Sequence, residues 1–179
     1  MKLLKEIIQY CKQTKGFSLI ELIIVVATVL FFSGLLLTQY GNFIEQSRLK
    51  TEANKLRDVL ELAKKKTLAR EIVSSCITGF DGYKVNINSN DYNVLFCCGD
   101  TCDSNNPVLS SSLTSQTNTV SIVSGTGSIQ FIPSLKGTSL TSDTTITLKN
   151  TAIGSSNKCI QVTVTKVGIV GVADSFSSC

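Results

Sequence analysis

The sequence predicts an α+β protein in which one long N-terminal helix packs on an antiparallel β-sheet head. Two features predict the helix: residues 17–37 are almost entirely apolar, and residues 38–72 carry apolar side chains at helical spacing. Residues 77–179 predict the sheet, because short β-rich runs alternate there with turn-prone stretches of Gly, Asn and Ser.

The apolar run at residues 17–37, FSLIELIIVVATVLFFSGLLL, would be about 30 Å long as a helix, enough to cross the hydrocarbon core of a bilayer. Basic residues precede it, so its N-terminal side is expected to stay in the cytoplasm. A secretory signal peptide would have a shorter apolar core followed by a small-x-small cleavage site. A plain membrane anchor would explain the length but not Glu21, because a carboxylate costs at least about 2.5 kcal/mol near the bilayer centre and usually marks a partner.

The segment after the apolar run continues the same helix. Five apolar residues at spacings of four and three form one stripe along it: Leu49, Ala53, Leu56, Leu60 and Ala63. As one helix, residues 17–72 would be about 84 Å long, so only the second half is expected to lie on the head. The lysines at 64–66 are interpreted as a solvated face, with an anionic partner surface as the alternative.

The head is expected to contain short antiparallel strands. Six runs rich in β-branched and aromatic residues are predicted as strands: 83–87, 92–97, 119–123, 128–132, 144–149 and 159–165. Apolar and polar residues alternate in the last two runs, which suits a sheet with one buried face. The Ser-rich stretch at 103–118 is predicted as a long loop.

The chain is accordingly divided into a leader at 1–16, a transmembrane and assembly helix at 17–37, a helical stem at 38–76 and a β-rich head at 77–179. The formal charge of +4 is spread unevenly over these parts. The leader has four Lys and one Glu (+3), the stem eight basic and five acidic residues (+3), and the head five Lys and six Asp (−1). Because nucleic-acid binding relies on basic neutralisation of phosphates, this distribution argues against such binding by the head.

Six of the seven cysteines lie beyond the apolar run: Cys76, Cys97, Cys98, Cys102, Cys159 and Cys179. An even number outside the membrane predicts up to three disulfides in an oxidising compartment, with fifteen pairings possible. A zinc site is the alternative, but the first four cysteines lack the usual Cys-x-x-Cys spacing and the chain has no His. We therefore predict disulfides, with no metal and no cofactor.

The residue content also indicates that the protein is not an enzyme. Without His, the commonest general base is missing, and the sequence contains no P-loop, dinucleotide-binding or nucleophile-elbow pattern. Four aspartates lie near expected turns: Asp81, Asp91, Asp100 and Asp103. Their spacing is not that of an EF-hand, so they are interpreted as turn formers rather than calcium ligands.

The junction between the leader and the apolar run reads KGFSLIE at residues 15–21. This motif resembles the class III signal of type IV prepilins and type II secretion pseudopilins: a basic leader ending in Gly, then Phe, a Glu four residues later and an unbroken apolar helix. The resemblance covers residues 1–40 closely. It implies that an inner-membrane prepilin peptidase cuts between Gly16 and Phe17 and methylates the new amino terminus of Phe17.

The resemblance also implies a role for Glu21 as the acidic residue of the assembled helix core. The ammonium group at Phe17 of one subunit and Glu21 of a neighbour would neutralise each other, and such a pair fixes register more than it adds stability. Gly16 suits the processing site because, without a side chain, its backbone can approach a protease closely.

A second resemblance points to a subgroup. Residues 47–70 look like the stem of minor pilins and H-type pseudopilins, and the runs at 129–137, 145–148 and 159–168 are similar to the β-head of that group. Many members have Gly-Arg in the last hairpin, whereas here Ile follows the Gly at position 168, which further disfavours DNA capture.

The resemblance therefore implies a structural subunit of a type IV pilus or a type II secretion pseudopilus. Such a protein waits in the bacterial inner membrane with its head outside the cytoplasm. An inner-membrane assembly platform then joins it to other pilins or pseudopilins in a helical fibre. Two alternatives stay open: a fibre-tip adhesin or DNA-binding pilin, and a single-pass membrane anchor that never assembles. The sequence does not separate the pilus from the secretion system.

Overall fold

The computed structural model describes residues 18–72, 76, 79–99, 101–113, 119–133, 137–154, 156 and 158–179, without the side chains of 35–39. Contacts within the chain divide it into two units, Met1–Gly41 and Asn42–Cys179. The described part of the first unit is helical, and the second combines helix with two antiparallel sheets. The predicted α+β class, a long helix with its second half packed on antiparallel sheet, is confirmed.

Helix α2 (Leu19–Leu68) is one continuous helix of 50 residues. It ends where Arg70 takes a left-handed conformation with φ of 48°. Two backbone bonds close this end: the amide of Arg70 donates to the carbonyl of Thr67 and that of Glu71 to the carbonyl of Lys66, each at 3.1 Å. This is the Schellman arrangement, which satisfies carbonyls left open by the last turn. The helix predicted for residues 17–72 therefore ends four residues early.

The first sheet has the strand order β3-β2-β1-β6, with β4 also paired to β2. Its strands are β1 (Phe80–Ile87), β2 (Asp91–Cys98), β3 (Thr101–Cys102), β4 (Leu109–Ser112) and β6 (Gly127–Phe131). The second sheet has the order β5-β7-β8-β9. Its strands are β5 (Val120–Ser124), β7 (Thr144–Asn150), β8 (Cys159–Val164) and β9 (Val170–Val172). Along the chain, β5 lies in the second sheet, β6 returns to the first, and β7 to β9 complete the second.

All six predicted strands are present, and three further strands were not predicted. The loop predicted for 103–118 is wrong at Leu109–Ser112, which forms β4 and pairs with β2, Leu109 facing Val94. Because three of its four residues are serines, this strand has no alternation of apolar and polar residues. Hydrophobic periodicity therefore could not predict it. β3 and β9 have only two and three residues, too few to show a period.

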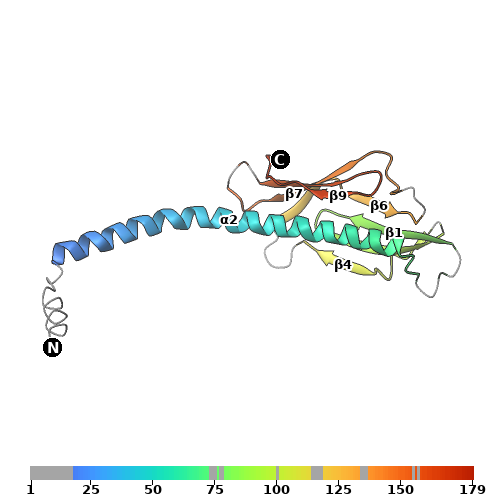
Figure 1. The fold of residues 1–179 in the computed structure, drawn as a ribbon, viewed down its shortest axis with the longest axis horizontal. Helices are drawn as coiled ribbons and strands as arrows, with labels where there is room; N and C mark the ends of the chain where they lie inside the picture. Colours follow the sequence, from blue (N-terminus) through green and yellow to red (C-terminus); the bar gives the residue numbers. More distant parts are fainter. Residues whose placement is uncertain are drawn as a thin grey trace, which may run out of the picture. The chain divides into compact units, whose positions relative to one another are not determined.

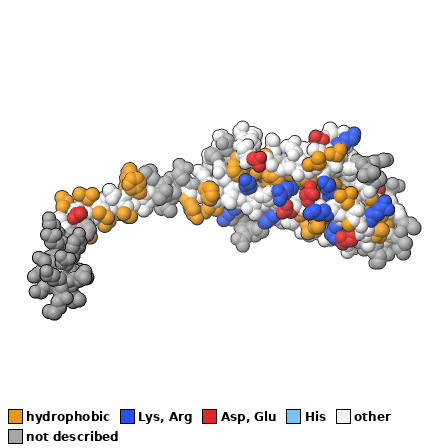
Figure 2. All heavy atoms as spheres, in the orientation of Figure 1, with side chains coloured by type: hydrophobic (Ala, Val, Ile, Leu, Met, Phe, Trp, Pro, Cys, Tyr) orange, Lys and Arg blue, Asp and Glu red, His pale blue; other side chains and the backbone are white. Residues whose placement is uncertain are grey.

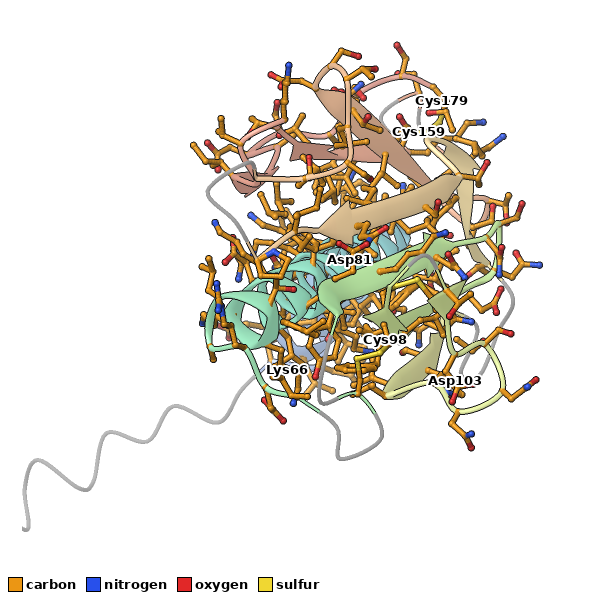
Figure 3. The ribbon with its side chains drawn as sticks, turned by 90° about the vertical axis from the view of Figure 1, so that its right-hand side faces the viewer. Lys66, Asp81, Cys98, Asp103, Cys159 and Cys179 are labelled. Atoms are coloured by element: carbon orange, nitrogen blue, oxygen red, sulfur yellow. A yellow bond between two sulfur atoms is a disulfide. The ribbon has the colours of Figure 1, made fainter. Side chains whose placement is uncertain are left out.

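The core of the second unit lies between α2 and the two sheets. The predicted stripe is confirmed, since all five of its members are 0% exposed: Leu49, Ala53, Leu56, Leu60 and Ala63. Figure 1 shows this part of α2 running alongside both sheets, and Figure 3 shows the same arrangement viewed along the helix. Tyr83 and Val85 of β1 and Ile146 and Leu148 of β7 belong to the same buried cluster. Each sheet therefore buries one face against the helix, as in other α+β layers.

Candidate assembly helix and disulfide-bonded head

The described part of the first unit exposes apolar side chains on every side of α2. Five consecutive residues, Leu22 to Val26, are each 50–57% exposed, and at 100° per residue they cover the full circumference of the helix. Other large apolar side chains along this segment are equally open: Leu19, Ile20, Val29, Leu30, Phe31 and Phe32. Figure 2 shows hydrophobic side chains in patches along this segment, on the face that is visible. A helix that is apolar all round is normally covered by other helices or by lipid.

Glu21 interrupts this surface. It is exposed in the first turn of α2 and is the only charged residue in the sequence between positions 18 and 44. Gly16 and Phe17, the predicted cleavage and methylation sites, lie outside the described residues. The pairing predicted between Glu21 and the Phe17 ammonium group of a neighbouring subunit therefore stays a prediction.

Across the described residues, none of the helical structure is both long enough and apolar enough to pass through a membrane. The transmembrane span predicted for residues 17–37 is thus not confirmed.

The six cysteines beyond the apolar run are joined in three disulfides: Cys76–Cys98, Cys97–Cys102 and Cys159–Cys179. This pairing supports the predicted disulfides and selects one of the fifteen possible connectivities. Neighbouring residues on a strand point to opposite faces, which explains why the adjacent Cys97 and Cys98 have different partners. Cys97 bonds to the residue directly opposite it on β3, while Cys98 bonds back to the segment after α2.

The third disulfide secures the last residues of the chain. Cys159 begins β8, and Ser177 pairs with it through two backbone hydrogen bonds of 2.8 and 3.0 Å. Cys179 then closes the loop two residues later, as Figure 3 shows. The segment after β9 is consequently held by both backbone and covalent bonds.

The buried side chains of Thr67 and Tyr83 link the C-terminal end of α2 to β1. The Thr67 hydroxyl, on a residue 1% exposed, donates to the Ala63 carbonyl at 2.9 Å and accepts from the Tyr83 amide at 3.2 Å. The Tyr83 hydroxyl in turn donates to the Glu71 carbonyl at 2.8 Å, and burial raises the pKa of this phenol. These contacts link the end of α2 to β1. They could not be predicted from the sequence, because no local spacing rule connects Tyr83 with Thr67, 16 positions away, or with Glu71, 12 positions away.

Of the four aspartates considered for calcium, the three that the structure describes belong to no common group of potential metal ligands. Asp103 accepts hydrogen bonds from the amides of Asn105 (3.0 Å) and Asn106 (3.3 Å), and the hydrogen bond from the Asn106 side chain does most to lower the pKa of its carboxyl group. Asp81 instead accepts from the Gln130 side chain at 2.7 Å. Asp100 lies outside the described residues. Among those described, no group of three or more potential metal ligands is found.

Charged side chains along the second half of α2 pair mainly with one another. Lys66 contacts Glu71 at 2.5 Å and Lys64 contacts Glu61 at 3.8 Å. Figure 2 shows positive and negative side chains interspersed over this part of the molecule. Interspersed charges favour the solvated-face interpretation of the lysines at 64–66 over a surface for an anionic partner.

Two clefts open near the C-terminal end of α2. One, of about 190 Å³, lies between Leu68, Phe131 and Val167 and has a mainly apolar lining. The other, of about 400 Å³, is lined by both charged and apolar residues, including Arg70 and Asp81. Sequence reasoning identified neither, because each brings residues at or just after the end of α2 together with residues that follow much later in the chain, such as Val167 and Pro133.

The structure thus combines a helix whose first part exposes apolar side chains with two antiparallel sheets. The structure of the type IV minor pilin FimU of Pseudomonas aeruginosa is similar to this chain, with a TM-score of 0.54. The likeness covers 76% of this chain and 98% of FimU, at 11% sequence identity. No protein-family model and no curated protein matches the sequence. The likeness to FimU therefore establishes the fold.

Proposed function

We propose that this chain is a structural, non-catalytic subunit of a helical fibre, either a type IV pilus or a type II secretion pseudopilus. The observation that carries the proposal is the apolar surface around the first part of α2, joined to a head with a pilin-like fold. The KGFSLIE motif at residues 15–21 supports it from the sequence side. The division into leader, membrane and assembly helix, stem and head belongs to the same proposal.

The apolar surface explains why the chain would assemble. Burying a Val, Leu, Ile or Phe side chain contributes about 1.5–3 kcal/mol. Leu22, Ile24 and Phe31 each leave more than half of their surface open in the single chain. Before assembly the bilayer of the bacterial inner membrane would cover them, and afterwards the corresponding helices of other pilins or pseudopilins would. The head would lie outside the cytoplasm, where its three disulfides can persist.

Processing would prepare the helix for the fibre. A prepilin peptidase would cut after Gly16 and methylate Phe17, and an assembly platform in the inner membrane would insert the subunit. In the fibre, Glu21 would face the methylated ammonium group of a neighbouring subunit. An ion pair removed from water specifies register, because a shifted helix would leave one charge buried without its partner.

Replacement of Glu21 tests assembly. We expect Glu21→Leu to lower the amount of the chain recovered in sheared fibres at least tenfold, while its amount in the membrane fraction is kept. Thr28→Val serves as a control on the same segment, since the Thr28 hydroxyl only donates to the Val25 carbonyl one turn earlier. If Glu21→Leu enters fibres as well as the unmodified chain does, the assembly role of Glu21 is wrong and the single-pass anchor becomes the better account.

A further inference from the structure

Arg70 occupies a position that normally belongs to glycine. It lies just beyond the last turn of α2 with φ of 48°, in the left-handed region that disfavours any residue with a Cβ atom. The Schellman arrangement that it completes usually has Gly at this place. Residues held in such conformations cluster at functional sites. The surroundings of the Arg70 guanidinium group therefore bear on function.

The side chain of Arg70 lines the cleft of about 400 Å³ at the end of α2. That volume is in the range of cavities that hold small molecules or one to two amino-acid residues. Four apolar residues, called the apolar wall below, also line the cleft: Ile72, Phe80, Ile132 and Pro133. Asp81 of β1, labelled in Figure 3, is the second charged residue of the lining.

The charges of the cleft are available to a ligand. Over the described part of the chain, Arg70 makes no ion pair and no side-chain hydrogen bond, unlike the neighbouring Lys66, which contacts Glu71. Gln130 donates to one carboxylate oxygen of Asp81, Oδ2, at 2.7 Å, which leaves Oδ1 to accept from a ligand. A guanidinium fork binds a carboxylate through two parallel hydrogen bonds.

We propose that this cleft binds the C-terminal residue of a peptide. Such a residue presents a carboxylate for Arg70, a backbone N–H for Asp81 and a side chain for the apolar wall. A phosphate group suits the cleft less well, because its second negative charge would lie beside the Asp81 carboxylate. The proposal does not depend on fibre assembly, since every residue that it uses belongs to the unit Asn42–Cys179.

The first test uses N-acetyl-L-phenylalanine as the probe, titrated calorimetrically into the full chain in detergent micelles. We expect it to bind at least tenfold more tightly than its amide, which lacks the carboxylate. Equal affinity of acid and amide, or no binding by either, would overturn the proposal. Titration of L-phenylalanine tests whether the cleft binds the end of a peptide or a free amino acid. If the free amino acid binds more tightly than the acetylated one, the site is for free amino acids and the peptide assignment is wrong.

The second test separates binding from folding through Arg70→Gly. Glycine relaxes the left-handed position, so the variant should unfold at a higher temperature and yet bind the probe at least tenfold more weakly. Lys65→Ala, which removes an exposed cation that does not line the cleft, should leave the affinity unchanged. An Arg70→Gly variant that keeps full affinity, or a Lys65→Ala variant that loses as much, would contradict the role of Arg70.

Discussion

Asn150, at the end of β7, donates two hydrogen bonds from its side-chain amide to Glu45 on α2, one to the backbone carbonyl at 3.1 Å and one to carboxylate Oε2 at 3.0 Å. Its own side-chain oxygen accepts from the Ala152 amide at 2.9 Å. Asn150 itself is 0% exposed, whereas Glu45 is partly buried and Ala152 is exposed, so these bonds lie at the edge of the core. This side chain fixes the start of the helical part of the head to the second sheet.

Removal of this amide should weaken the head. In Asn150→Ala, two hydrogen bonds to backbone groups, each worth about 0.5–1.5 kcal/mol, and one to the Glu45 carboxylate, worth about 1.5–3 kcal/mol, are lost, and water replaces part of them. We expect a loss of about 2–4 kcal/mol in the free energy of unfolding, measured by urea denaturation. Gln161→Ala, an exposed substitution on the neighbouring strand β8, should change it by less than about 0.5 kcal/mol. Equal losses in the two variants would contradict the anchoring role of Asn150.

The disulfides should differ in how much they stabilise the fold. In the chain-entropy account a bond contributes more when it closes a longer loop, about 3 kcal/mol for the 20-residue separation of Cys159–Cys179 and about 2 kcal/mol for the 5-residue separation of Cys97–Cys102. Pairwise replacement by alanine, followed by urea denaturation, measures both. If removal of Cys97–Cys102 destabilises the protein more than removal of Cys159–Cys179, the chain-entropy account is wrong for this protein.

The head should lose stability at alkaline pH. Burial raises the pKa of both Tyr83 and Tyr92 above the ordinary value near 10. The unfolded chain therefore releases these protons at lower pH than the folded chain does. Stability is fully present below about pH 10 and falls as the pH rises beyond it. We expect Tyr92→Phe to flatten this decline in the free energy of unfolding between about pH 9 and 11, measured with free thiols alkylated so that disulfide exchange does not contribute. If the free energy of unfolding of Tyr92→Phe falls with pH as steeply as that of the unmodified protein, groups other than Tyr92 cause the decline.

The parts of the fold that could be predicted from the sequence depend on local periodicity. Leu49 to Ala63 recur at helical spacing and are buried as a stripe, and Ile146 and Leu148 alternate as a strand should. β4 could not be predicted, because its serines carry no pattern and only pairing with β2 makes it a strand.

The contact between α2 and the second sheet could not be predicted either, because it joins residues that are distant in the chain. Asn150 and Glu45 are 105 positions apart, and no local rule connects them. The Cys97–Cys102 disulfide likewise follows from the strand register that places these two residues opposite each other. The motif at residues 15–21 was identified from the sequence alone. Its first residues lie outside the described structure.

The most direct test of the account is the mass of the N-terminal peptide of the protein purified from its native membrane. The account predicts a peptide that begins at Phe17 and carries one added methyl group. A peptide that begins at Met1, from cells whose prepilin peptidase is active on its other substrates, would contradict it.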